Sequence, residues 1–308
     1  MKKFILKVLY LFVSFSLLTL LMYFSSMLIK SKVSIEIINK ESIEAAQILI
    51  LGDSRADRQI NPNSLNKLTK KKCLNIGESS LDLYSLSLRL QKIKLENKIL
   101  IISASSFQTN DGSIDQGYFR IEAYNALTFQ QKLDLYIGNP NELKKILSKN
   151  ILSGFKIKLT LGNENSYIND GYTNISCKNF LTTDFIKNHP WYKKNNRSGV
   201  KNILLERALI SLNKIKCRQI IIYNAPIYKE FKNLAVVNGF WEYENDFSKQ
   251  IKKCLKIYNL KKIRFYDLTN LDGFDKSDFY DPHHLCEKGA NKFTERIHLI
   301  FNLNSLSF

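Results

Sequence analysis

The chain has 308 residues, with 46 Lys and Arg against 28 Asp and Glu, and a formal net charge of +18. This length suffices for one large domain or one domain with an insertion. The lysines are spread along the whole chain instead of forming a basic stripe with interleaved aromatic residues, which argues against nucleic acid as a partner. The five cysteines are widely spaced and form no CxxC pair, which argues against a zinc site or a dense disulfide framework and leaves a single disulfide open.

The N-terminus contains an uncharged run of 22 residues, from Val8 to Ile29. Such a run can cross a hydrocarbon core of about 30 Å, and it is longer than the apolar region of a signal peptide. We therefore expect residues 1–30 to form a cytoplasmic tail and transmembrane anchor, residues 31–46 a connector, and residues 47–308 a domain outside the cytoplasm. The expected location is the bacterial cell (inner) membrane, with a single span.

Five apolar segments of strand length follow, and they are apolar throughout instead of alternating with polar residues. Segments with helical spacing lie between these apolar segments and after the last one. This alternation predicts an α/β fold: a three-layer sandwich with a central parallel sheet of about five strands. Residues from about 110 to 200 break this pattern and are interpreted as an insertion. The predicted strands are 47–51, 73–77, 98–103, 219–224 and 263–267, and the predicted helices begin at 61–62 or cover 81–95, 202–214, 245–258 and 287–301.

The first predicted strand ends at Gly52-Asp53-Ser54, where a parallel sheet would deliver a serine to its carboxyl edge. A serine nucleophile needs a base, and Asp281-Pro282-His283-His284 offers one before the last predicted helix. We predict Ser54 as nucleophile, His284 or the competing His283 as base, and Asp281 as the group that orients the base. Asp53 is interpreted as a cap of the turn after the strand.

These two blocks resemble the SGNH, or GDSL-type, hydrolase superfamily, and the Asp-x-x-His spacing of that family implies that His284 is the base. The phrase from Leu51 to Asp57, the Asn75-Ile76-Gly77 turn and the segment His284 to Ala290 resemble in particular its membrane-anchored envelope branch, which includes the teichoic-acid D-alanine transfer protein and the alginate O-acetyltransferases. The resemblance covers about residues 46–106 and 202–301, and it implies a flavodoxin-like SGNH fold.

The resemblance also implies an oxyanion hole made by the backbone N–H groups of Ser54 and Gly77 and by an asparagine side chain. The family's Gly-x-Asn-Asp block should follow the third strand almost directly, but this chain departs from that pattern. Asn110 is the predicted donor from a longer loop, Ser105 or Ser106 are the alternatives, and the donor could also be absent.

The function expected from this resemblance is a serine esterase or O-acyltransferase that forms an acyl-enzyme on ester groups of cell-envelope polysaccharide. The expected partners are an acylated or acyl-accepting envelope glycan, the lipid bilayer through the N-terminal span, and a multi-span acyl-donor membrane protein. No cofactor and no metal are expected, because the sequence has no phosphate-binding glycine loop and no paired histidines apart from His283-His284. The alternative is a non-catalytic SGNH-fold carbohydrate-binding or assembly component of an envelope acylation system.

Overall fold

The computed structural model describes residues 40–78, 81–91, 93–106, 172–177, 181, 202–237, 241–303 and 305, together with 10, 13–14 and 16–18. The chain divides into two compact units, and the described domain belongs to the unit formed by Glu41–Ala126 and Tyr167–Phe308. Most of the predicted anchor, and the predicted insertion except 172–177 and 181, lie outside the described residues. Within the described part of the chain, no helix is both long and apolar enough to cross a bilayer.

The centre of the domain is a parallel sheet, whose strands all come from the predicted apolar segments. Every residue of the first four strands is buried, including those of the edge strand from Cys73 to Asn75, which explains why these segments lack alternation. The strand order β2-β1-β3-β4-β5 is that of a flavodoxin-like fold, so the predicted α/β class with a parallel sheet of five strands is confirmed. The strands are β1 (Ile48–Leu51), β2 (Cys73–Asn75), β3 (Ile99–Ser103), β4 (Gln219–Asn224) and β5 (Ile263–Asp267).

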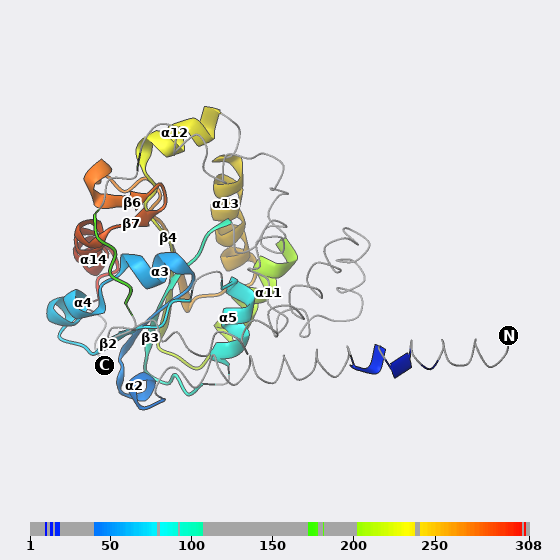
Figure 1. Ribbon diagram of the computed structural model, residues 1–308. Coiled ribbons are helices and arrows are strands. Elements are labelled where there is room, and N and C mark those ends of the chain that lie inside the picture. The colour runs from blue at the N-terminus through cyan, green and yellow to red at the C-terminus, as the bar shows by residue number, and fades with distance from the viewer. Residues whose placement is uncertain are drawn as a thin grey trace. The chain divides into compact units, whose positions relative to one another are not determined.

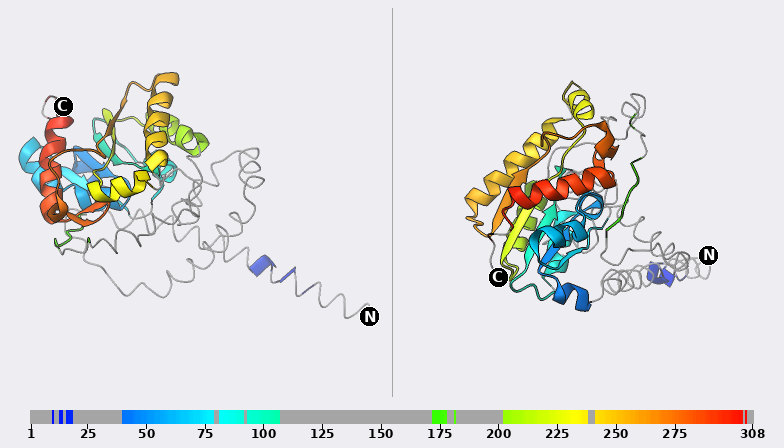
Figure 2. Two further views of the ribbon diagram at one scale, coloured as in Figure 1. Left: turned by 90° about the horizontal axis from the view of Figure 1, so that it is seen from above. Right: turned by 90° about the vertical axis from the view of Figure 1, so that its left-hand side faces the viewer.

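Helices cover the sheet as two groups. The first group packs α14 (Glu287–Ile300) against α3 (Ser54–Gln59) and α4 (Pro62–Thr69), and the second packs α11 (Asn202–Asn213) against α5 (Leu83–Leu90) and α13 (Trp241–Ile257). The two groups lie on opposite sides of the strands, as α14 and α13 show (Figure 1). The views in Figure 2 show the same separation, so the domain has the three layers expected of this fold.

Five described elements were not predicted, and three of them form the site. Helix α3 begins directly at Ser54, and the hairpin of β6 (Phe279–Asp281) and β7 (His284–Leu285) replaces what the sequence suggested was a loop. The others are α12 (Lys229–Val237) and the 3₁₀ turn η4 (Lys276–Asp278). The predicted connector ends in the short helix α2 (Lys40–Ala45).

Candidate active site

The serine enters the site because β1 ends in a tight turn. Gly52 has a φ of +125°, and a Cβ on it would come within 2.5 Å of the Ser103 carbonyl oxygen, so only glycine fits between the ends of β1 and β3. Asp53 then caps α3, since its Oδ1 accepts a hydrogen bond from the Arg55 N–H at 3.0 Å. Ser54 is therefore the first residue of a helix at the carboxyl edge of the sheet, between the two strands where the strand order reverses.

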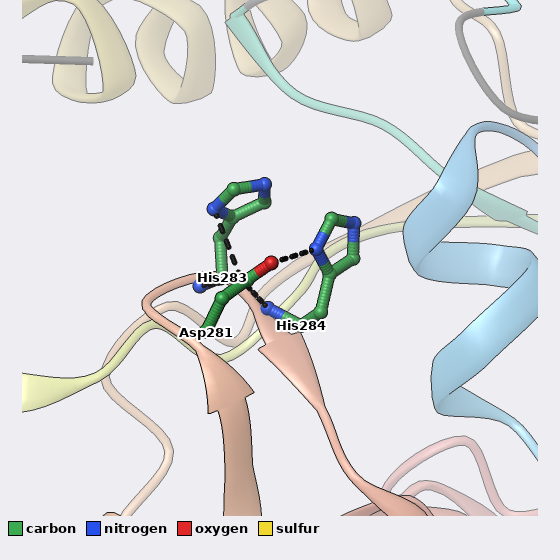
Figure 3. Close-up of side chains that lie close together, drawn as sticks. All are labelled: Asp281, His283 and His284. Atoms are coloured by element: carbon green, nitrogen blue, oxygen red, sulfur yellow. Dashed lines mark hydrogen bonds and ion pairs between the residues drawn. The ribbon is translucent and has the colours of Figure 1, made fainter. Parts of the chain in front are cut away.

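The acid and the base come from one hairpin, whose two-residue turn is Pro282-His283. Asp281 initiates the turn: its Oδ1 accepts from the backbone N–H of His283 at 3.0 Å and of His284 at 2.9 Å. The remaining carboxylate oxygen, Oδ2, lies 2.7 Å from His284 Nδ1 (Figure 3). The local sequence Asp-Pro-His-His therefore fixes the acid beside the base without help from distant residues.

The two halves of the site meet across 230 residues of sequence. Ser54 Oγ lies 2.8 Å from His284 Nε2, on the opposite side of the ring from Asp281. The structure thus brings together Ser54, His284 and Asp281, the three residues predicted from the sequence. The competing base, His283, also faces the acid, with Nδ1 at 3.3 Å from Asp281 Oδ1, but the described contacts connect Ser54 to His284.

The Asp281 carboxyl is held in its ionised form. Burial by itself raises the pKa of this group. The charge of His283 and the hydrogen bond and charge of His284 lower the pKa by more than burial raises it, so the pKa lies well below its usual range. A carboxylate that stays ionised accepts the Nδ1 hydrogen of His284 and leaves the Nε2 lone pair directed at Ser54. This tautomer is the one in which His284 can remove the serine proton.

Gln59 ties the serine helix to the hairpin, and sequence reasoning missed it. Its Nε2 donates to the His283 carbonyl oxygen at 2.7 Å, and its side chain is fully buried. Asn75, at the end of β2, holds the same helix from the other side by donating to the carbonyls of Ala56 at 2.7 Å and Ile60 at 3.0 Å. No motif marks Gln59, because its partner is a backbone atom far along the chain.

Gly77, a predicted oxyanion donor, packs closely against α3. A Cβ there would lie 2.4 Å from the Asp57 backbone nitrogen, so any other residue at this position would clash with that helix. Its N–H donates to Asn75 Oδ1 at 3.0 Å. The expected oxyanion donor therefore already has an acceptor within the protein.

The other groups expected to donate to the oxyanion are the Asn110 side chain, the alternatives Ser105 and Ser106, and the Ser54 N–H. Asn110 lies outside the described residues. Ser106 Oγ donates to Glu244 Oε1 at 2.7 Å in a buried position, and Ser105 is fully buried. The Ser54 N–H begins α3 and has no acceptor within the helix, as is general for the first turn.

One described segment of the predicted insertion reaches the site. Thr173 Oγ1 donates to Asp57 Oδ1 at 2.9 Å, and the Thr173 N–H donates to the Asp57 carbonyl at 3.2 Å, both on the serine helix. Cys177 then forms a disulfide with Cys286, two residues after His284, with a Cα–Cα distance of 5.0 Å. The segment 172–177 therefore links the helix of the nucleophile to the strand of the base.

Comparison of the sequence with protein-family models and with curated proteins found no match.

Proposed function

We propose that this chain is a serine esterase or O-acyltransferase of the SGNH type that forms an acyl-enzyme at Ser54. The observation that carries the proposal is the continuous chain of hydrogen-bonding contacts Ser54–His284–Asp281, at 2.8 Å and 2.7 Å. An arrangement of nucleophile, base and orienting carboxylate is the signature of nucleophilic catalysis on acyl groups, whatever the fold that carries it.

In the proposed reaction, Ser54 Oγ attacks the carbonyl carbon of an ester while its proton passes to His284 Nε2. The resulting imidazolium is stabilised by the ionised Asp281 at Nδ1. Collapse of the tetrahedral intermediate releases the alcohol, which takes the proton from His284 and leaves the acyl group on Ser54. Water or a hydroxyl group then attacks the acyl carbon and gives its proton to His284 Nε2. When the bond from the acyl carbon to Ser54 Oγ breaks, His284 returns this proton to Ser54 Oγ and the product leaves.

The negative charge on the carbonyl oxygen needs donors, each typically contributing about 10²–10³ in rate. The Ser54 N–H is the donor that we favour, because it has no acceptor within its own helix. Gly77 would act only after releasing its N–H from Asn75, and Asn110 stays a prediction.

A cell-envelope setting is part of the proposal. The disulfide between Cys177 and Cys286 supports it, because such bonds persist in oxidising compartments and are rare in the cytosol. The uncharged run at residues 8–29 supports membrane attachment. We therefore propose an envelope glycan as the acylated or acyl-accepting substrate, with a multi-span membrane protein as acyl donor if the reaction is a transfer.

The alternative is a non-catalytic carbohydrate-binding or assembly component with the same fold. One observation favours it: the Gly77 N–H donates to Asn75, so an expected oxyanion donor is engaged inside the protein. A binding component would keep the fold and need no oxyanion hole. The test below separates the two functions.

The test is covalent labelling of the full chain in detergent with a fluorophosphonate, together with turnover of short-chain p-nitrophenyl esters. We expect label on the peptide that contains Ser54, and loss of labelling and turnover in Ser54→Ala and His284→Ala. Ser64→Ala and His298→Gln are the matched controls, because both residues lie in the same domain outside the hydrogen-bonded chain. A well-folded wild type with neither labelling nor turnover, even with a glycan acceptor and membranes added, would favour the binding component.

A further inference from the structure

Two imidazole rings face one carboxylate in the β6–β7 hairpin, although the proposed reaction uses only one of them. The rings of His283 and His284 have centroids 4.1 Å apart, and both lie beside the Asp281 carboxylate (Figure 3). His283 Nδ1 is 3.3 Å from Asp281 Oδ1, and His284 Nδ1 is 2.7 Å from Asp281 Oδ2. The proposed reaction explains why Asp281 and His284 lie together, but it does not explain His283. His283 is therefore a third possible metal ligand beside this pair.

We propose that Asp281, His283 and His284 form a binding site for a divalent transition metal ion of the Zn²⁺ class, and that the bound ion blocks the serine–histidine pair. Two imidazoles and one carboxylate are ligands that Zn²⁺ accepts, with a fourth position left to water. Calcium and magnesium are poor candidates, because they prefer sets made of oxygen atoms.

The spacing of the three groups suits such an ion. One ligand atom from each residue lies within 4.8 Å of the others. Tetrahedral zinc with bonds of about 2.0–2.2 Å places its ligand atoms about 3.3 Å apart. His283 Nδ1 lies 3.3 Å from Asp281 Oδ1 and His284 Nδ1 lies 2.7 Å from Asp281 Oδ2, so each imidazole is already near one carboxylate oxygen, and a bound ion requires the side chains to rotate.

The backbone around these ligands is already fixed. Asp281 Oδ1 accepts two backbone N–H groups of the turn, and Gln59 holds the His283 carbonyl oxygen from the neighbouring helix. The disulfide of Cys286 anchors the chain two residues after His284. Fixed outer contacts of this kind orient ligands and reduce the entropy lost on metal binding.

The effect on the reaction follows from the proton count of imidazole. A neutral ring has one N–H and one lone pair. If the Nδ1 lone pair of His284 binds the metal, its proton moves through solvent to Nε2, which then donates toward Ser54 and no longer accepts the serine proton. Metal binding and base catalysis at His284 are therefore mutually exclusive. This inhibitory effect rests on the proposed function, whereas metal binding itself does not.

The test is equilibrium binding to the full, metal-stripped chain carrying Ser54→Ala, so that catalytic activity plays no part. We expect Zn²⁺ titration calorimetry to give one ion per chain, and Co²⁺ to give a visible spectrum of nitrogen and oxygen ligation. His283→Gln and Asp281→Asn should each weaken Zn²⁺ binding by at least about tenfold. His189→Gln and His298→Gln, which change the chain's two other histidines, should leave it within about twofold.

The second measurement is ester turnover of the chain with Ser54 intact. Zn²⁺ at the concentrations that saturate binding should suppress turnover, and EDTA should restore it. For His283→Gln, the same Zn²⁺ concentrations should suppress turnover less, when the variant with zinc is compared with the variant without zinc.

Three results would overturn the metal site: no stoichiometric Zn²⁺ binding, equal binding by His283→Gln, or a near-ultraviolet thiolate band with Co²⁺, which would assign the ion to a cysteine. Zinc binding without any ester turnover would instead support the site and count against the proposed function.

Discussion

Two polar clusters lie at the carboxyl ends of the central strands, and neighbouring residues of one turn contribute to both. The catalytic cluster comprises Ser54, His284 and Asp281. The buried network comprises Asp53, Arg55, Asn224, Glu244 and Ser106. Ser54 is partly exposed, whereas every member of the buried network is almost fully excluded from solvent.

The polar side chains of the buried network are hydrogen-bonded to one another. The Arg55 guanidinium donates to Asp53 Oδ2 at 3.1 Å and to Asn224 Oδ1 at 3.4 Å. Glu244, from α13, accepts from Asn224 at 2.9 Å and from Ser106 at 2.7 Å. This network connects the ends of β1, β3 and β4 to the helix layer, and it buries Arg55 inside the domain.

The difference between the clusters shows that ionisable residues beside a nucleophile need not take part in its chemistry. In the buried network each described polar contact is internal, so its expected role is stability. In the catalytic cluster the contacts run from the interior to a hydroxyl group near solvent, so its expected role is reaction. Changes in the two clusters should therefore affect different measurements.

The largest expected effect is that of Asp281→Asn on ester turnover. An asparagine favours the wrong tautomer of His284, and we expect kcat to fall by about 10³–10⁴. Asp267→Asn is the matched control, because Asp267 also ends a strand but contacts Ser248 and Thr269, and its kcat should stay within about threefold. An Asp281→Asn variant with near-normal kcat would remove the acid from the proposed mechanism.

The same variant tests the ionisation of Asp281 by its stability. Because the pKa of Asp281 is lowered in the folded state, its carboxylate stabilises the protein above the unfolded pKa of about 4. The wild type should therefore exceed Asp281→Asn in free energy of unfolding at neutral pH, and the gap should shrink as the pH falls below about 4. Denaturant unfolding at a series of pH values measures this gap, and a gap that widens in acid would contradict the assigned direction.

The next effect is that of Arg55→Met on stability. The substitution leaves the Asp53 carboxylate buried without its partner, and we expect a loss of about 3–5 kcal/mol in the free energy of unfolding. Arg58→Met, on the same helix, is the control: its side chain is 29% exposed and its ion pair with Asp57 spans 3.8 Å, so we expect less than about 1 kcal/mol. Equal losses in both variants would mean that the buried network is not a stability element.

The next effect is that of removing the disulfide, which should lower the free energy of unfolding by about 2–4 kcal/mol. It joins cysteines 109 residues apart, so Cys177→Ser releases a long loop, and it also frees the segment beside His284. We therefore expect both stability and turnover to fall, unlike Arg55→Met, in which the folded fraction should keep its turnover. Cys217→Ser changes a free cysteine and serves as control. Alkylation of Cys177 and Cys286 in the unreduced, denatured chain would contradict the bond.

The smallest effect is expected for Ser106→Ala. Loss of the hydroxyl leaves Glu244 Oε1 without this donor, and we expect about 1–3 kcal/mol of destabilisation with kcat changed by less than about tenfold. Ser64→Ala, at the half-buried contact with Asn291, is the control. A fall in kcat of about 10²–10³ without loss of stability would instead make Ser106 an oxyanion donor.

Much of the sheet was predictable because parallel strands that are buried on both faces have continuous apolar sequences. Strands β4 and β5 have the predicted bounds, and α4 begins where Asn61 and Pro62 indicated, with the Asn61 side chain accepting from the N–H groups of Asn63 and Ser64. Helix α3 was missed because six residues with buried Arg55 and Asp57 show no apolar periodicity. The β6–β7 hairpin was missed because two strands of three and two residues are too short to carry a pattern.

The sequence by itself determined the strands of the central sheet, the serine at the end of the first strand, and the acid and base within one turn, because each depends on neighbours along the chain. Only the tertiary structure decided that His284 Nε2 lies against Ser54 Oγ and that Gly77 packs on α3. It also decided that Arg55 is buried with Asp53 and that Cys177 pairs with Cys286. These contacts join segments far apart in sequence or depend on which face of a helix is buried, and packing of the whole domain sets both.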